Sequence, residues 1–198
     1  MVPRFLLGVV LGGLMLGCQA GPTGATQGDA PLTQTMRYYD GQRWREVWVN
    51  EREVVEFIPP GQESTARAAL PTATLVVEGR GVRIWRLDQV DAANRLSRGL
   101  ASSKEYSPVF HLSPQGGSRL ALSGNIVIRF KSGWSIEQIQ AWIDSQKLAQ
   151  VKILGTEPAT YVLSVGNGLD ALARANAIQE SGEVEYAMPE WWREVSKR

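Results

Sequence analysis

The chain of 198 residues has one cysteine, one histidine and almost no net charge, with 21 Lys and Arg against 20 Asp and Glu. One cysteine excludes an intrachain disulfide, and His111 has no neighbouring pattern typical of a zinc site or a nucleophilic triad, which favours a structural histidine. Balanced charge gives no basic footprint for nucleic acid. No glycine-rich loop has a phosphate-binding signature. We therefore expect no enzyme, no metal, no cofactor and no small-molecule substrate.

Residues 1–17 have the composition of a signal peptide, because Arg4 precedes an apolar run that is too short to span a bilayer. Residues 15–18, Met-Leu-Gly-Cys, resemble a bacterial lipoprotein box. The resemblance implies cleavage before Cys18 and lipidation of its sulfur, which would anchor the mature chain stably to a membrane. We expect a position in the bacterial cell envelope, on the periplasmic side of the outer membrane. The alternative is an incidental cysteine in an ordinary signal peptide.

A flexible tether is expected at residues 18–35, which are rich in Gly, Thr, Ala, Gln and Pro and have no apolar period. A chain of this length has a root-mean-square span of roughly 20–25 Å. The tether would therefore hold a folded domain at some distance from a lipid surface.

Residues 36–112 predict a small α+β unit. Asp40-Gly41, between aromatic residues, is typical of a tight hairpin turn, and Asp88 can cap a short helix. Short strands are predicted in the segment from Val47 to Phe57 and at residues 75–77, 82–87 and 106–112. Residues 113–121, rich in Pro, Gln and Gly, are interpreted as a linker to the next domain.

The hydrophobic period alternates between strand and helix values in the C-terminal domain, residues 122–189. Strands are predicted at 125–130, 151–154, 159–165 and 183–188, and helices at 135–147 and 169–181. Ser135 with Gln138 forms a capping-box pattern, and Gly182 lies where a C-cap is expected. The order is βαββαβ, a ferredoxin-like antiparallel sheet with both helices on one face. The predicted inner faces of the helices consist of Ile136, Ile139, Trp142, Ile143, Leu172, Ala175 and Ile178.

The two α+β units share sequence patterns that indicate a degenerate repeat. Residues 53–57 align with 126–130, residues 83–87 with 161–165, and residues 93–96 with 175–178, although the first helix of the earlier unit is weak or absent. The offsets between these matches differ, so a second interpretation stays open: two small α+β units can look alike by chance.

Two segments resemble the N-terminal prodomain of subtilisin-like serine proteases. They are Ile-Val-Ile-Arg-Phe-Lys-Ser-Gly at residues 126–133 and the closing stretch from Leu169 to Trp191. With the chain between them, the resemblance extends over residues 124–191, about 68 of 198 residues. A catalytic domain normally follows such a prodomain, whereas this chain ends at Arg198. The resemblance therefore implies a stand-alone prodomain that acts as intermolecular chaperone and inhibitor of a subtilisin-like serine protease.

The resemblance also implies where a partner would bind. The last strand would carry acidic side chains toward helix N-termini of the protease, and the tail at 190–198 would enter its active-site cleft. Large aromatic residues would anchor the tail, and a terminal dibasic pair would suit a protease that cuts after paired basic residues. The expected partner-binding residues are Glu183, Glu185, Tyr186, Trp191, Trp192, Lys197 and Arg198.

Two alternatives to the chaperone remain open from the sequence. The first is an envelope lipoprotein that uses the prodomain fold as a scaffold or adaptor. The second is the severed N-terminal part of a split subtilisin-like protease. Glu183 and Glu185 could also imitate a glycosidase pair, but a solvated or partner-facing strand edge is the favoured interpretation.

Overall fold

The computed structural model describes residues 32–59, 61–87, 105–166 and 168–195. These residues belong to one compact unit. The predicted signal peptide, Cys18, most of the tether, the helix expected after Asp88, and the terminal pair Lys197 and Arg198 lie outside them.

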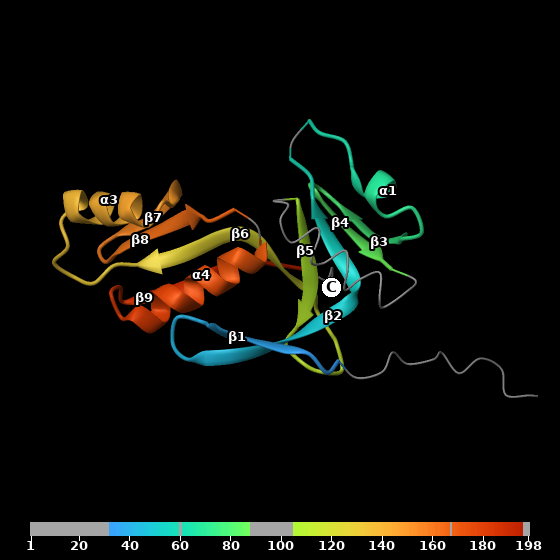
Figure 1. The fold of residues 1–198 in the computed structure, drawn as a ribbon, viewed down its shortest axis with the longest axis horizontal. Coiled ribbons are helices and arrows are strands. Elements are labelled where there is room, and N and C mark those ends of the chain that lie inside the picture. Colours follow the sequence, from blue (N-terminus) through green and yellow to red (C-terminus); the bar gives the residue numbers. More distant parts are fainter. Residues whose placement is uncertain (1–31, 60, 88–104, 167, 196–198) are drawn as a thin grey trace, which may run out of the picture. The chain divides into compact units, whose positions relative to one another are not determined.

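The described residues form nine strands and three helices, and all strand pairs are antiparallel (Figure 1). The fold is therefore α+β, as the sequence predicts. The elements are β1 (Thr35–Tyr39), β2 (Trp44–Phe57), α1 (Ala66–Ala69), β3 (Thr74–Gly79), β4 (Val82–Arg86), β5 (Tyr106–His111), β6 (Leu120–Arg129), α3 (Ile136–Ser145), β7 (Ala149–Thr156), β8 (Ala159–Ser164), α4 (Gly168–Ser181) and β9 (Tyr186–Arg193).

The sheet contains the same strand connectivity twice. Its order is β3-β4-β2-β5-β6-β8-β7, with β1 on β2 and β9 on β6. The first half of the sheet reads β3-β4-β2-β5, and the second half reads β7-β8-β6-β9. When the strands of each half are taken in chain order, both halves place the second strand beside the third, the third beside the first, and the first beside the fourth. The sequence predicts that the first helix of the earlier unit is weak or absent, and the corresponding helix, α1, has only four residues. This agreement supports the repeat interpretation.

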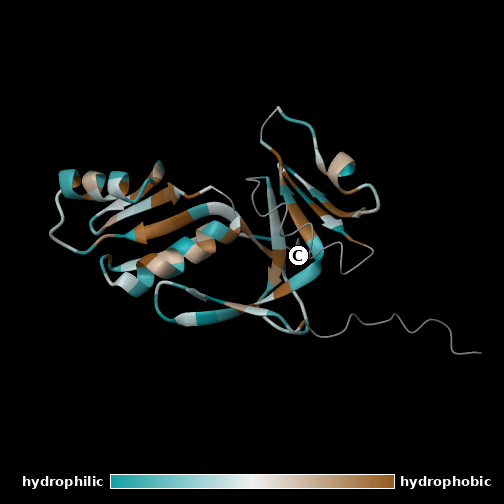
Figure 2. Ribbon diagram, viewed as in Figure 1, coloured by the Kyte–Doolittle hydropathy of each residue, from teal (hydrophilic) through white to brown (hydrophobic). Residues whose placement is uncertain are grey.

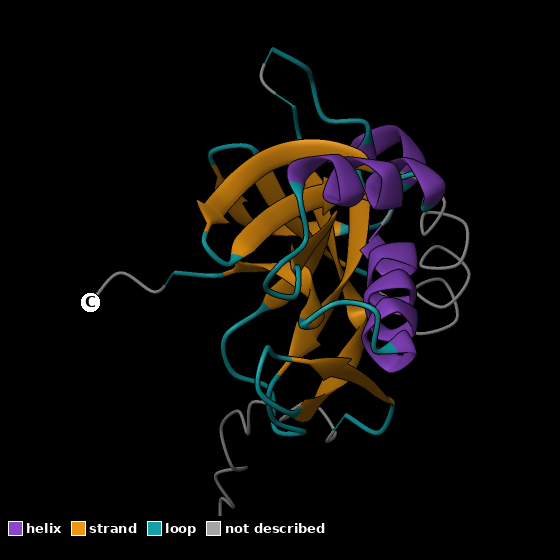
Figure 3. Ribbon diagram, turned by 90° about the vertical axis from the view of Figure 1, so that its left-hand side faces the viewer, coloured by secondary structure: helices purple, strands orange, loops and turns teal. Residues whose placement is uncertain are grey.

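Both long helices pack on one side of the second half of the sheet (Figure 3). The capping box is confirmed, because Gln138 N–H donates to Ser135 Oγ at 3.3 Å and Ser135 N–H donates to Gln138 Oε1 at 2.8 Å. Figure 2 shows α3 alternating between polar and apolar residues, whereas β6 is largely apolar. The buried cluster comprises Ile126, Ile128 and Phe130 of the β6 segment, Tyr161 and Leu163 of β8, Ile139 and Ile143 of α3, and Ala171, Ala175 and Ile178 of α4.

One predicted core position is wrong. Ile136 is 75% exposed, although it continues the apolar stripe of α3. It is the first residue of the helix, directly after the Ser135 cap. The stripe therefore reaches the sheet only from Ile139 onward.

The predicted linker is shorter in the structure, because β6 begins at Leu120 rather than at residue 125. Leu120 and Ala121 pair with Arg193 and Trp192 of β9. Leu120 also lies opposite Phe110 of β5, which joins the two halves into one sheet. The two units predicted from the sequence therefore share strand β6.

The hairpin between β1 and β2 is confirmed at Asp40-Gly41. Asp40 Oδ1 accepts the N–H groups of Gln42 and Arg43 at 2.9 Å each, and Gly41 has a φ of +92°, which glycine adopts without strain. The side-chain hydrogen bond from Arg45, with those two backbone N–H groups, lowers the pKa of Asp40 to about 2. The turn therefore carries an ionised carboxylate that closes it.

A buried carboxylate organises the loop that leads into α1. Glu56 of β2 accepts hydrogen bonds from the Ser64 hydroxyl, the N–H groups of Thr65 and Ala66, and the Trp85 indole N–H at 3.0 Å. These donors satisfy a carboxylate that has lost its contact with water. Glu56 thus connects β2, β4 and the α1 loop.

The start of α4 approaches β6 too closely for any side chain at Gly168. An added Cβ would lie 2.8 Å from both Cβ and the carbonyl oxygen of Leu122. We expect Gly168→Ala to lower the free energy of unfolding by about 1–3 kcal/mol, although alanine favours helices. Denaturant unfolding measures this change. Gly79→Ala is the control, because its nearest contact would be an ordinary 3.6 Å, and equal stability of both variants would contradict the prediction.

Candidate partner-binding surface

The face of the second half opposite α3 and α4 is formed by alternate residues of β6, β8 and β9. Arg129 lies between Thr160 and Tyr186, and Val127 lies between Val162 and Met188. Side chains alternate along a strand, so these residues point away from the helix-bearing face that carries Ile126 and Ile128. We call this set, Val127, Arg129, Thr160, Val162, Tyr186 and Met188, the helix-free face.

Charged groups flank the helix-free face at two positions. The guanidinium of Arg129 lies 5.0 Å from the Tyr186 ring centroid, and its Nη1 is 3.7 Å from a Glu185 carboxylate oxygen. Elsewhere on the face, Glu190 accepts from Asn125 Nδ2 at 2.9 Å and lies 3.6 Å from Lys152 Nζ. Arg129, Tyr186 and Met188 are partly exposed, whereas Val127, Thr160 and Val162 are buried. Partly exposed aromatic and arginine side chains are typical of protein-binding surfaces.

The two glutamates predicted on the last strand lie before it instead, because β9 begins at Tyr186. They also do not share a face. The Glu183 carboxylate accepts the indole N–H of Trp142 on α3 at 3.0 Å, whereas Glu185 pairs with Arg129. Both remain exposed. Glu185 therefore lies beside the helix-free face through its pair with Arg129, Tyr186 belongs to that face, and Glu183 lies on the helix side.

The two tryptophans expected in a free tail lie inside β9. The Trp191 ring packs edge-on against Tyr38 and Phe110, with centroids 5.2 and 5.3 Å away. Trp192 packs against Val55, Ile84, Val109 and Ala121. The sequence placed the strand end near Pro189, but β9 continues to Arg193 because the β6–β9 register shifts beside this proline. Both tryptophans therefore fasten β9 to the first half of the protein.

A buried ion-pair network holds the end of β9. Glu53 of β2 is 3% exposed and receives Arg119 Nε at 2.6 Å and Arg86 Nη2 at 2.8 Å. Arg119 also binds both carboxylate oxygens of Glu194 at 3.2 Å. Burial alone would raise the pKa of Glu53, but hydrogen bonds from the two arginines outweigh it and lower the pKa from 4.5. The predicted tail is thus fixed as far as Glu194.

The single histidine has a structural position. His111 is buried in β5, where Nδ1 lies 3.1 Å from the Gly117 carbonyl oxygen and Nε2 lies 3.4 Å from Asn50 Nδ2. A carbonyl oxygen only accepts, so Nδ1 carries the proton and Nε2 accepts from the amide. Within the described ranges, no three His, Cys, Asp or Glu side chains gather as a metal site.

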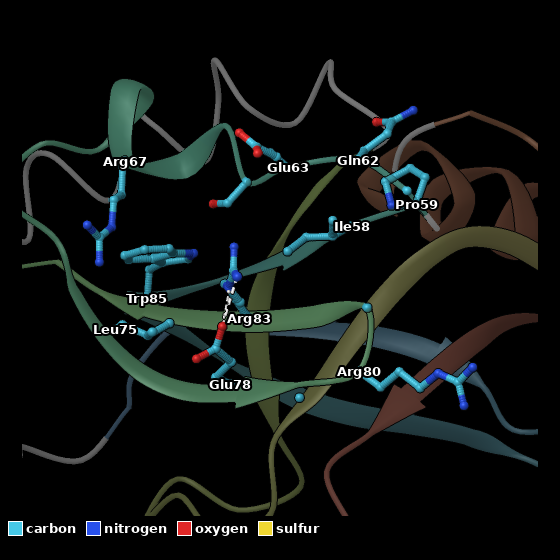
Figure 4. Close-up of a pocket in the computed structure, with 14 residues that line it drawn as sticks. Ile58, Pro59, Gln62, Glu63, Arg67, Leu75, Glu78, Arg80, Arg83 and Trp85 are labelled. Carbon is cyan, nitrogen blue, oxygen red and sulfur yellow. Dashed lines mark hydrogen bonds and ion pairs between the residues drawn. The ribbon is translucent and has the colours of Figure 1, made fainter.

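A pocket of about 660 Å³ lies between the α1 loop and the β3–β4 hairpin (Figure 4). Arg83 donates to Glu78 at 2.8 and 3.0 Å, and the Trp85 indole N–H is taken by Glu56. Arg67 and Arg80 have no carboxylate partner among the residues that the structure describes. All of its lining residues lie between Ile58 and Trp85, and no sequence pattern indicated this pocket.

A scan against protein-family models and a search of curated protein sequences both return no match. In the part of the chain that the structure describes, no helix is both long enough and apolar enough to cross a membrane.

Proposed function

We propose that this protein is a non-catalytic, stand-alone prodomain that acts as intermolecular chaperone and inhibitor of a subtilisin-like serine protease. The observation that carries the proposal is the strand order β9-β6-β8-β7 with α3 and α4 on one side. This order supports a ferredoxin-like arrangement of the βαββαβ unit, the fold implied by the resemblance at residues 126–133 and 169–191. The helix-free face would be the surface that meets the protease.

One interface explains both activities. Subtilisin-like catalytic domains contain parallel β topology with distant contacts, so their folding is slow, and a preformed complementary surface lowers the barrier. The same surface binds the native protease more tightly than the unfolded one, which stabilises and occludes it. Lipidation at Cys18 would place this activity at a membrane of the cell envelope.

The role of the helix-free face is tested by replacing Tyr186 and Met188, its partly exposed aromatic and apolar side chains. We expect Tyr186→Ala with Met188→Ala to raise the inhibition constant against a purified bacterial subtilisin by about 30-fold or more, the loss expected when interface anchors worth about 2 kcal/mol are removed. Inhibition is measured by peptide hydrolysis with the chain from Gln19 onward, without the lipid.

The control carries two substitutions on the outer side of α3, Gln140→Ala with Asp144→Ala. These side chains are exposed and bond only to each other, at 2.9 Å, among the described residues. The control should inhibit as the wild type does. No inhibition by the wild-type chain, or an equal loss in both variants, would contradict the proposed function.

A further inference from the structure

The last part of strand β9 is bound to the first half of the protein, although the sequence predicts a free tail from residue 190. Residues 186–189 of β9 pair with residues 126–129 of β6, which belong to the second half. Residues 191–193 pair with residues 120–122 of β6, where β6 meets β5. We call residues 190–194 the anchored segment.

Side chains of the first half contact the anchored segment on both of its faces. On one face, the Trp191 ring packs against Tyr38 of β1 and Phe110 of β5. On the other face, Trp192 packs against fully buried apolar residues of β2, β4, β5 and β6. The two largest side chains of the segment therefore contact the chain itself.

Hydrogen bonds hold both ends of the anchored segment. At its start, Ser123 Oγ donates to the Glu190 carbonyl oxygen at 3.1 Å. At its end, the Glu194 N–H donates to the Arg119 carbonyl oxygen at 2.9 Å, and Arg119 Nη1 donates to both carboxylate oxygens of Glu194 at 3.2 Å. Arg119 in turn donates to the buried Glu53 at 2.6 and 3.1 Å. Separating the segment from the sheet breaks these contacts together.

These contacts decide how a protease can reach the anchored segment. A protease cuts a chain that lies extended in its cleft, and a strand that is already paired in its own sheet must first open. When opening and closing are fast, the rate of cleavage follows the population of the open form. Each contact with the first half lowers that population, and with it the rate of cleavage.

We propose that the first half holds residues 190–194 out of the protease's active-site cleft and thereby protects the chain from digestion by its own partner. The inference rests on the proposed function and adds the duration of inhibition to it, because the chain inhibits for as long as this segment stays in the sheet. The resemblance to prodomains extends over residues 124–191 and does not include the first half, so it does not imply this protection.

The test uses Trp192→Ala with Glu194→Ala, in the chain from Gln19 onward. The chain is mixed with an excess of purified bacterial subtilisin, and mass spectrometry gives the initial rate of cleavage between residues 189 and 195. Each rate is divided by that of a synthetic peptide with residues 186–198 of the same variant, so that the sequence preference of subtilisin cancels. We expect this ratio to rise about 30-fold over the wild type, equivalent to about 2 kcal/mol less for opening the segment.

The duration of inhibition is measured in equimolar mixtures by peptide hydrolysis over time. The double variant should lose its initial inhibition faster than the wild type, because digestion removes the inhibitor. Should the double variant lose its cooperative unfolding transition, Glu194→Gln alone provides the test, with an expected rise in the cleavage ratio of about fivefold.

The matched control is Arg193→Ala with Val195→Ala, which changes exposed side chains on the opposite side of the same segment. Its cleavage ratio should equal that of the wild type. Equal ratios in the two double variants would overturn the inference, as would a wild-type segment that is cut as fast as its peptide. Absence of inhibition by the wild type would instead overturn the proposed function, and the cleavage ratios would still be measurable.

Discussion

Replacing Arg119 by methionine should lower the free energy of unfolding by about 3–5 kcal/mol, because it leaves the carboxylate of Glu53 buried without its main partner. Glu53 is 3% exposed and takes two of its three arginine hydrogen bonds from Arg119. Glu194 loses its bidentate partner at the same time. Denaturant unfolding at neutral pH measures the effect.

The pH dependence of this loss of stability shows whether the buried carboxylate of Glu53 causes it. Since the folded pKa of Glu53 lies below its ordinary value of 4.5, its contribution to stability is complete above pH 4.5 and is lost as the pH falls through the folded pKa. The difference between wild type and Arg119→Met should therefore shrink below about pH 4.5. The control Arg37→Met breaks an exposed pair with Glu180 and should change stability by less than about 1 kcal/mol. A pH-independent loss would contradict the assignment.

Phe130→Ala should also lower the free energy of unfolding by about 3–5 kcal/mol, because it opens a cavity in the helix-side core. Phe130 is fully buried, and its ring centroid lies 5.3 Å from Trp142, 5.5 Å from Trp134 and 5.7 Å from Tyr161. Urea unfolding gives the magnitude, and near-ultraviolet circular dichroism reports the tryptophan packing.

Phe130→Leu is the companion variant, since leucine fills part of the same space. It should lower the free energy of unfolding by clearly less than Phe130→Ala does, and the unfolding transition should stay cooperative. If alanine and leucine were equally tolerated, the aromatic cluster would not hold α3 on the sheet. The motif residues thus divide their roles, with Phe130 in the core and Arg129 on the opposite face.

Local signals predicted the second half well. The Ser135 capping box, the helical spacing of Leu172, Ala175 and Ile178, and the positive φ of Gly182 all act within a few residues, so the sequence shows them directly. The α+β class follows from the same alternation of periods. The limits of α4 differ from the prediction by one residue at its start.

Long-range contacts account for what the sequence did not show. Pro189 reads as the end of a strand, but a register shift between Leu122 and Ile126 accommodates it, and β9 continues. The network of Glu53, Arg119 and Glu194 joins residues 66 and 75 positions apart, so no local pattern reveals it. For the same reason, the sequence predicts that Trp191 binds a partner, whereas its ring packs against Tyr38 and Phe110 in the structure.

Strand β6 contributes side chains to two hydrophobic clusters, and this limits how the protein can be shortened. Leu120 and Leu122 pack with Phe110 of the first half, while Ile126 and Ile128 pack with the helices of the second. Deleting residues 32–111 would uncover one end of β6, and deleting residues 120–195 would uncover β5. Whatever the origin of the two halves, a lineage that carries this chain is expected to keep both or lose both.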